Sequence, residues 1–115
     1  MARLSTHVLD TAHGCPATGV RIDLYQLQPA QLNLSTITNE DGRTSQPLLQ
    51  GDVIATGRYE LVFHAGEYFR RRGVTLTEPA FLEEIRIAFG ISDSAGHYHV
   101  PLLVSPYGYT TYRGS

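Results

Sequence analysis

Apolar residues recur mainly at every second position along this chain, in short runs separated by Gly, Pro, Asn and Asp. This alternation is typical of strands that bury one face, so the sequence predicts a mostly β protein. The pattern is clean from Val20, where Val20, Ile22 and Leu24 should point inward. Similar strands are expected around His7 and at residues 32–38, 59–64, 84–91, 97–104 and, at the end of the chain, 107–115.

Residues 66–73 form the one segment with the features of a helix. Glu67 lies near its start, Arg70–Arg72 near its end and Gly73 just beyond, an order that suits the helix dipole and a glycine stop. We interpret the arginines as a solvated helix end rather than as a patch for phosphate or nucleic acid. A tight turn is predicted at residues 39–42, because Asn, Asp and Gly tolerate the positive φ that such a turn requires.

The composition mainly excludes certain domain arrangements and classes of function. A chain of 115 residues, 42% hydrophobic and 17% charged, suffices for one core but not for two, so residues 1–115 are expected to form a single domain. The nine basic residues are all arginines and oppose eleven acidic ones, which leaves a formal charge of -2. No overall field therefore favours nucleic acid or an anionic membrane, and a mechanism based on lysine is excluded.

The single cysteine, Cys15, excludes an intrachain disulfide and a multi-thiolate zinc site, and it suits a reducing compartment. The first residues lack the apolar run of a signal peptide, and no stretch approaches the roughly 18 apolar residues of a membrane helix. We therefore expect a soluble, cytoplasmic protein.

Both faces of the strand at 97–104 carry side chains suited to burial. One face is formed by Tyr98, Val100, Leu102 and Val104. The other face is formed by His97, His99, Pro101 and Leu103. This second face thus combines apolar residues with histidines. In a β-sandwich that stays monomeric, the outer face of a strand would carry solvated polar groups instead. This face is a candidate subunit interface that encloses a polar cavity.

His97 and His99 lie on the same side of that strand, a spacing that can serve a metal ion or a pair of proton-transfer groups. A zinc site would need a third protein ligand, for which His7 is the only plausible histidine. Ordinary surface histidines are an equally good interpretation. A nucleophilic Cys15 activated by His13 is a weaker alternative, because Gly, Cys and Pro at 14–16 indicate a turn with no defined place for the imidazole.

Three separated motifs carry a resemblance to a known family. They are LSTHVLDTA at residues 4–12, TNEDGR at residues 38–43, and HYHVPLL at residues 97–103, which continues through SPY at 105–107 to YRGS at 112–115. Together they resemble the 5-hydroxyisourate hydrolases, the transthyretin-like enzymes of urate breakdown, over the whole chain. The closing YRGS tetrapeptide is the most specific element, because it follows the histidine motif at the expected spacing.

The resemblance implies an all-β, transthyretin-like fold: a two-sheet Greek-key β-sandwich of about eight strands with one short helix. It also implies a homotetramer built from two dimers, with the sites at subunit interfaces. Catalytic roles are implied for His7, Arg43 and His99, and substrate binding for Tyr112 and Ser115. No metal, other cofactor, nucleic acid or membrane is implied.

The reaction implied by the family is the hydrolysis of 5-hydroxyisourate to 2-oxo-4-hydroxy-4-carboxy-5-ureidoimidazoline. A neutral histidine can deprotonate a water that attacks the ring carbonyl, while a guanidinium stabilises the oxyanion. Arg43 close to either imidazole would lower the pKa of that imidazole and keep it available as a base. The separate roles of His7, His99 and Tyr112 in proton transfer stay open, and His97 does not match a catalytic residue of the family.

Two functions of other classes compete with this hypothesis. A transthyretin-like carrier would bind an aromatic ligand in the same channel, but the resemblance implies that such carriers lack the two histidines and the arginine. A plain β-sandwich interaction module would dock a partner through its outer sheet and would not need His7, Arg43 and His99 to converge. Coordinates that bring these three side chains together would therefore favour the enzyme.

Overall fold

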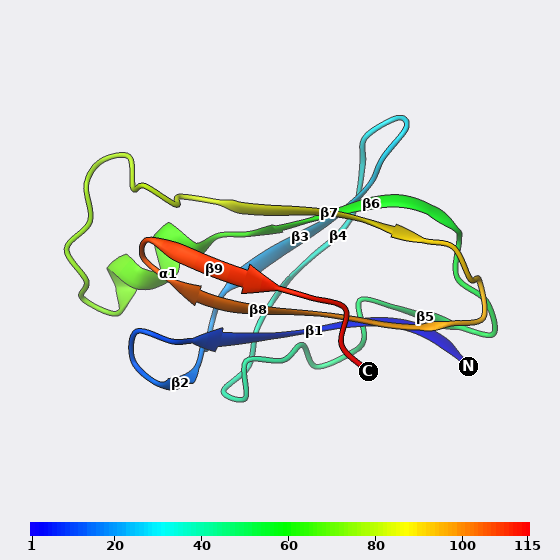
Figure 1. Ribbon diagram of the computed structural model, residues 1–115, viewed down its shortest axis with the longest axis horizontal. Coiled ribbons are helices and arrows are strands. Elements are labelled where there is room, and N and C mark those ends of the chain that lie inside the picture. The colour runs from blue at the N-terminus through cyan, green and yellow to red at the C-terminus, as the bar shows by residue number, and fades with distance from the viewer.

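The computed structural model describes residues 1–115 and contains nine strands and one helix. The elements are β1 (Ala2–Asp10), β2 (Cys15–Pro16), β3 (Arg21–Gln26), β4 (Gln31–Ile37), β5 (Leu49–Gly51), β6 (Gly57–Phe63), α1 (Ala65–Arg71), β7 (Ile85–Ile91), β8 (His97–Ser105) and β9 (Gly108–Thr111). They form two layers that face each other, with α1 at one end (Figure 1). The predicted two-sheet β-sandwich is confirmed. The helix α1 has seven residues, too few to span a bilayer.

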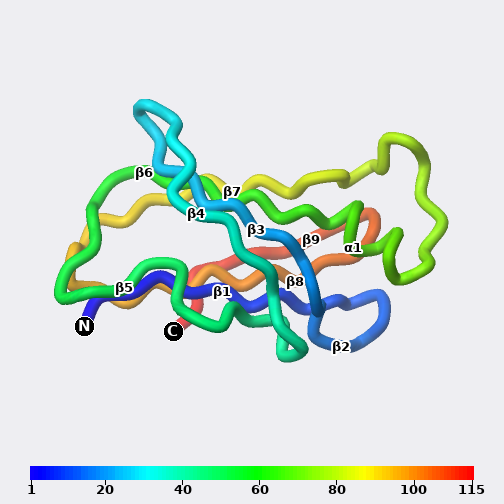
Figure 2. The backbone as a smooth tube through the Cα atoms, turned by 180° about the vertical axis from the view of Figure 1, so that it is seen from behind, coloured from blue at the N-terminus to red at the C-terminus, as the bar shows by residue number.

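The two sheets differ in how the chain builds them. One sheet has the order β4-β3-β6-β7, and all its neighbours are antiparallel. The other has the order β2-β1-β8-β9, with β5 also paired to β1. In this sheet β1 and β8 run parallel, so the beginning of the chain lies beside a strand near its end (Figure 2). The strands expected to carry His7 and His99 are therefore neighbours.

Alternating apolar residues from both sheets fill the space between the layers, as the sequence predicts. Leu4 and Val8 of β1 and Leu102 of β8 meet Leu24 and Leu61 of the opposite sheet in one core, and all five are fully buried. Because successive side chains of a strand point to opposite faces, the residues between these positions face outward. The outer face of the β1-β8 sheet consequently carries the histidines.

Helix α1 forms near the predicted segment because it buries one side against the core. Ala65, Tyr68 and Phe69 are buried, and the chain leaves the helix through Gly73, whose φ is 84°. Glu67 lies in the first turn, as expected from the helix dipole. The short helix is held by this packing, because an isolated helix of two turns is unstable in water.

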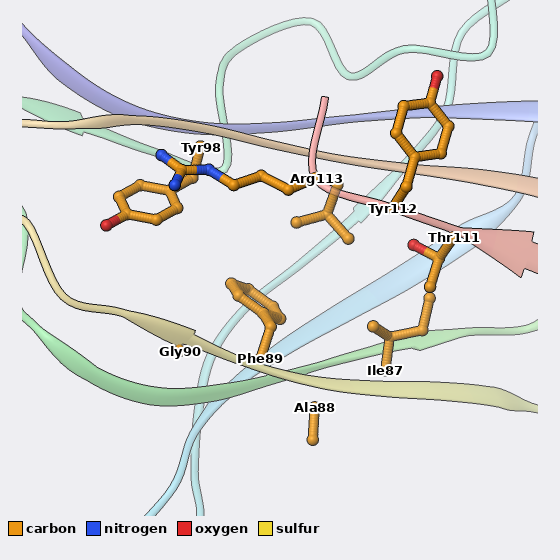
Figure 3. Close-up of a pocket in the computed structure, with 9 residues that line it drawn as sticks. Ile87, Ala88, Phe89, Gly90, Tyr98, Thr111, Tyr112 and Arg113 are labelled. Atoms are coloured by element: carbon orange, nitrogen blue, oxygen red, sulfur yellow. The ribbon is translucent and has the colours of Figure 1, made fainter. Parts of the chain in front are cut away.

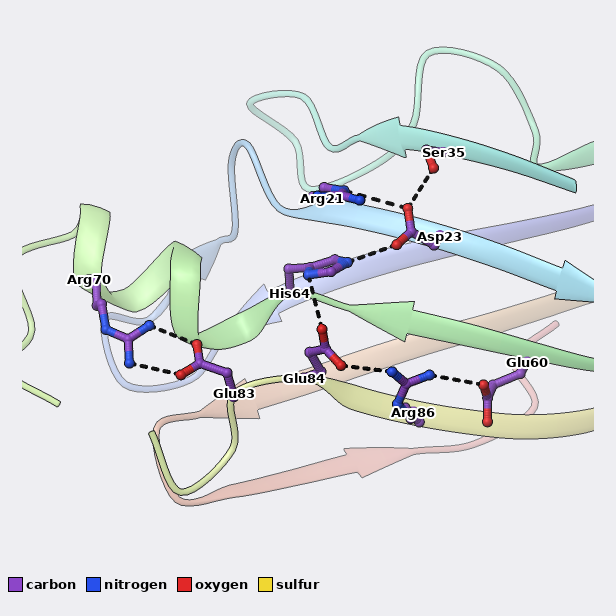
Figure 4. Close-up of polar contacts among 9 residues, drawn as sticks. All are labelled: Arg21, Asp23, Ser35, Glu60, His64, Arg70, Glu83, Glu84 and Arg86. Carbon is purple, nitrogen blue, oxygen red and sulfur yellow. Dashed lines mark hydrogen bonds and ion pairs between the residues drawn. The ribbon is translucent and has the colours of Figure 1, made fainter. Parts of the chain in front are cut away.

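Arg71 and Arg72 are exposed at the end of α1, as the prediction of a solvated helix end requires, but all three arginines also bind other parts of the chain. Each contacts a different part of the chain: Arg70 donates two hydrogen bonds to the Glu83 carboxylate at 2.7 and 2.8 Å, Arg71 donates to the Gly19 carbonyl at 2.6 Å, and Arg72 lies 3.7 Å from Cys15 Sγ. The Arg70 pair is drawn in Figure 4. The sequence predicted a solvated helix end, but it could not reveal that carboxylate, carbonyl and thiol groups lie within reach of these side chains.

Two local expectations also differ from the structure. Cys15 and Pro16 belong to strand β2, which pairs with Leu9 and Asp10 across a tight turn, rather than to the turn itself. The final strand, expected over 107–115, ends at Thr111, and beyond it Gly114 forms an isolated antiparallel bridge to His99 in the same register as β8 and β9. The backbone near the C-terminus therefore stays beside β8 and lies next to His99.

The outer face of the second sheet holds a polar network around Asp23. Although Asp23 occupies an outward position of β3, it is only 5% exposed. Its carboxylate accepts a hydrogen bond from Ser35 Oγ at 2.6 Å and lies 2.9 Å from His64 Nε2 (Figure 4). Burial acts to raise the pKa of Asp23, but these partners and Arg21 lower it overall. The network links β3, β4 and the start of α1.

Candidate active site

The parallel pairing of β1 and β8 places the two candidate histidines, His7 and His99, on neighbouring strands. Ser5 is the register partner of His99, and His7 is the partner of Pro101. The preceding pair, Leu4 and Tyr98, is buried in the core, so Ser5, His7 and His99 share the outer face of the sheet. Both histidines are partly exposed there.

The turn at residues 39–42 is attached to β1 next to His7. The Val8 amide donates a hydrogen bond to the Gly42 carbonyl at 2.8 Å, and His7 Nε2 lies 2.8 Å from the Asp41 carbonyl oxygen. Gly42 has a φ of 75°, and a Cβ on it would lie 2.3 Å from the Val8 carbonyl oxygen. Glycine is therefore required both by the backbone conformation and by the close approach to β1.

Arg43 emerges from this turn. Asn39 Oδ1 accepts hydrogen bonds from the amides of Asp41 at 2.9 Å and of Arg43 at 3.2 Å, and the Asn39 amide donates to the Arg43 carbonyl at 2.8 Å. This side-chain capping fixes the turn and sets where the Arg43 side chain begins. The Arg43 residue is exposed, so its guanidinium is available to a ligand.

The electrostatic surroundings of His99 indicate that Arg43 and His7 lie near it. Its pKa is lowered, first by partial burial and then by the nearby positive charges of Arg43, His7 and Arg3. The backbone carbonyl of Ser5 acts in the opposite direction. The expectation that Arg43 lowers the pKa of a neighbouring imidazole is confirmed for His99, although burial is the larger cause. A His99 that stays neutral near pH 7 can accept a proton from water.

The C-terminal candidates lie at the border of this face. Tyr112 follows β9 and is 56% exposed, and its side chain points away from Ile87 and Phe89 (Figure 3). The adjacent Arg113 turns the other way, placing its guanidinium 4.2 Å from the centre of the Tyr98 ring. Ser115 is exposed and follows Gly114, whose amide donates to the His99 carbonyl at 2.7 Å. The end of the chain therefore lies beside His99.

His97 and His99 do not act as a matched pair. His97 Nε2 contacts the Met1 carbonyl oxygen, and the His97 carbonyl accepts a hydrogen bond from Arg113 at 3.1 Å. Its ring therefore contacts the first residue of the chain, whereas the ring of His99 is influenced by Arg43 and His7. No group of three or more His, Cys, Asp or Glu side chains is arranged to hold a metal ion.

The alternative nucleophile, Cys15 with His13, is not assembled. His13 Nδ1 lies 2.6 Å from Asp10 Oδ2, and Tyr68 donates a hydrogen bond to the same oxygen at 2.7 Å. Cys15 is instead contacted by Arg72. Asp10 is 1% exposed, so His13 and Tyr68 serve to satisfy a buried carboxylate.

Sequence reasoning missed three contributors to the surroundings of His99: Arg3, Ser5 and Gly114. Alternation in the first strand placed Ser5 on the face of His7, but nothing local indicated that Ser5 pairs with a residue 94 positions away. Gly114 could have been suspected only from its place in the YRGS motif. The missing signal was the parallel register of β1 and β8, which depends on the whole fold.

These observations define a class of protein: a transthyretin-type β-sandwich whose outer sheet face carries two histidines, with the turn that precedes Arg43 attached to β1 beside one of them. The chain belongs to the HIUase/Transthyretin family, whose model matches residues 4–114. The 5-hydroxyisourate hydrolase of Pseudomonas aeruginosa is 58% identical over 117 aligned residues, which cover 100% of this chain and 93% of that protein.

Solved structures agree with this assignment. The structure of Klebsiella pneumoniae 5-hydroxyisourate hydrolase is matched with a TM-score of 0.81 and 34% identity, covering 100% of this chain and 94% of that one. The crystal structure of (S)-allantoin synthase is matched with a TM-score of 0.92 and 45% identity, covering 99% of this chain. This chain spans only 44% of that synthase.

Proposed function

We propose that this chain is a 5-hydroxyisourate hydrolase, which opens the ring of its substrate to give 2-oxo-4-hydroxy-4-carboxy-5-ureidoimidazoline. The proposal is supported by the position of His7 and His99 on neighbouring strands of the outer sheet face, next to the turn that precedes Arg43, and by the effect of the Arg43 charge on the pKa of His99. The names of similar proteins, including that from Pseudomonas aeruginosa, support the same reaction. A carrier or a docking module would have no need for this group of side chains.

The proposed chemistry begins with His99 as the general base. Its lowered pKa keeps the imidazole neutral near pH 7, so it can take a proton from a water that attacks the ring carbonyl. The oxygen of that carbonyl gains negative charge as the new C–O bond forms, and the Arg43 guanidinium stabilises it. Collapse of the intermediate breaks the C–N bond and leaves a carboxyl group. A proton must then reach the departing nitrogen.

His7 and Tyr112 are the two candidates to deliver that proton or to orient the ring. The Asp41 carbonyl can only accept a hydrogen bond, so its contact with His7 favours the tautomer that carries a proton on Nε2. Ser115 is proposed to border the bound substrate next to His99. These roles need no metal or other cofactor.

We further propose a homotetramer built from two dimers, in which a second subunit covers the histidine face. Leu9 and Leu103 are half-buried on that face, so an apolar rim accompanies the polar site. A second contact is available at the open edge between the sheets, where β7 and β9 have no further strand neighbours. The crevice there is lined mostly by apolar residues, including Ile87 and Phe89 (Figure 3). Both surfaces would be covered in the assembly.

We also assign the activity to the cytoplasm. The free thiol of Cys15 is compatible with a reducing compartment.

The test is an ultraviolet assay with freshly generated 5-hydroxyisourate, in which decay is followed with and without protein. The wild-type chain should accelerate decay above the spontaneous rate. His99→Ala and Arg43→Ala should each lower kcat/KM by about 100-fold while the circular dichroism spectrum is unchanged. Arg58→Ala, an exposed arginine of the other sheet, is the matched control and should retain activity. Decay at the spontaneous rate with the wild-type protein would refute the proposal.

A further inference from the structure

The imidazole of His99 is held from two sides by groups that the proposed mechanism does not use. On the β1 side, Ser5 Oγ lies 2.8 Å from His99 Nδ1. The two residues are register partners in the parallel ladder, and both are half-buried. The distance between the hydroxyl and the ring is therefore fixed by the backbone of two paired strands and not by a flexible loop.

On the opposite side, the backbone of Gly114 packs against the ring. A Cβ on Gly114 would lie 2.6 Å from His99 Cδ2 and 3.3 Å from Cγ, closer than a side chain can approach without displacing the imidazole. The Gly114 amide is hydrogen-bonded to the His99 carbonyl at 2.7 Å, so this segment cannot easily retreat. The terminal segment thus borders one edge of the ring while Ser5 contacts the other.

These contacts leave one ring nitrogen for chemistry. His99 Nε2 makes no hydrogen bond within the chain, and it is accessible, since every buried side-chain nitrogen and oxygen has a partner. A hydroxyl oxygen can accept a hydrogen bond from Nδ1–H, so the contact with Ser5 Oγ can hold the tautomer that carries its proton on Nδ1. The side of the ring that faces Ser5 is therefore favoured to carry the proton. A neutral His99 then has its unprotonated nitrogen at the accessible Nε2.

We propose that Ser5 is a positioning residue that holds His99 in the orientation and tautomer in which Nε2 accepts the proton from water. This inference rests on the proposed hydrolase function, since it assigns a task to Ser5 in that reaction. Ser5 acts through His99 and touches no reacting atom. A ring free to rotate or to exchange tautomers would present a usable Nε2 for only part of the time.

The first test compares Ser5→Val with Ser5→Thr, two β-branched residues of similar shape that both suit a strand and differ in the hydroxyl. Ser5→Thr should keep kcat within about twofold of wild type, whereas Ser5→Val should lower kcat about tenfold with little change in KM. Ser35→Ala, which removes a hydroxyl bound to Asp23 in the other sheet, is the control and should leave kcat unchanged. Equal kcat values for the Val and Thr variants would overturn the proposal.

The second test measures the tautomer population of the His99 ring by nitrogen NMR and requires no turnover. Wild-type His99 should be mainly the Nδ1–H tautomer at a pH where it is neutral, and Ser5→Val should shift the population toward a mixture. Gly114→Ala should change the His99 signals as well, because the added methyl displaces the ring. An unchanged tautomer population in Ser5→Val would refute the role of Ser5. Because this result is independent of the assay, it remains decisive even if the wild-type chain fails to hydrolyse 5-hydroxyisourate.

Discussion

His99 is the side chain whose protonation most directly controls the proposed reaction. Its pKa lies below the ordinary value of 6.5 because of partial burial first, and then because of the charges of Arg43, His7 and Arg3. Burial and positive charge both disfavour the imidazolium. The neutral form of His99, which can act as a base, should therefore persist to lower pH than that of an exposed histidine.

Removing one of these charges should raise the pKa of His99. Arg43→Ala is expected to move it upward, whereas Arg43→Lys should leave it close to wild type because the positive charge remains. Arg3→Ala should have a smaller effect than Arg43→Ala, since Arg3 contributes less. NMR titration of the His99 ring measures all three without substrate. An Arg43→Ala protein with an unaltered His99 pKa would contradict the proximity of these two groups.

At the scale of elements, the buried carboxylate of Asp10 connects the end of β1 to helix α1. It accepts hydrogen bonds from Tyr68 at 2.7 Å and from the amides of Ala12 and His13 at 2.9 and 3.0 Å. Burial acts to raise the pKa of Asp10, but these hydrogen bonds and the contact with the His13 ring lower it overall. The carboxylate therefore stays ionised in the folded protein and depends on its donors.

Tyr68→Phe should destabilise the protein by about 1–3 kcal/mol, because it leaves a buried charged acceptor with one donor fewer. Tyr59→Phe is the matched control. Its hydroxyl donates to the neutral Ala55 carbonyl at 2.6 Å, so its removal should cost about 0.5–1.5 kcal/mol. Urea unfolding of both variants and wild type at one pH and one protein concentration measures the difference. A Tyr59→Phe protein less stable than Tyr68→Phe would argue against an ionised Asp10.

At the scale of the whole molecule, the proposed assembly would cover the histidine face of each chain. Leu103 is half-buried on this face next to β9, where it pairs with Thr110. A leucine in this position is better accommodated by a covering subunit than by water. The proposed assembly and the proposed chemistry therefore use the same surface.

Leu103→Glu should shift the protein toward smaller species in sedimentation velocity and lower its specific activity, because a charge would be buried at the subunit contact. The fold should survive, since Leu103 points away from the core. Leu32→Glu is the control: Leu32 lies on β4 of the other sheet, is 51% exposed and should leave size and activity unaltered. An unchanged sedimentation coefficient for Leu103→Glu would remove this face from the assembly.

The sequence by itself predicted the longer strands, their inward faces and the turn before Arg43, but not the short strands β2 and β5. Alternation depends only on neighbouring residues, so Leu4 and Val8 could be predicted to point inward and His7 outward. The positive φ at Gly42 also followed from local chemistry. The candidate residues His7, Arg43, His99, Tyr112 and Ser115 came from the resemblance to a family and not from periodicity.

Only the tertiary structure decided which distant residues meet. The parallel register that sets Ser5 against His99 joins positions 94 residues apart, and no local pattern encodes such a pairing. The same holds for the contact of Gly114 with the His99 ring and for the partner of Arg70. Each depends on packing two sheets around one core, because that packing fixes strand neighbours and thereby the distances between side chains.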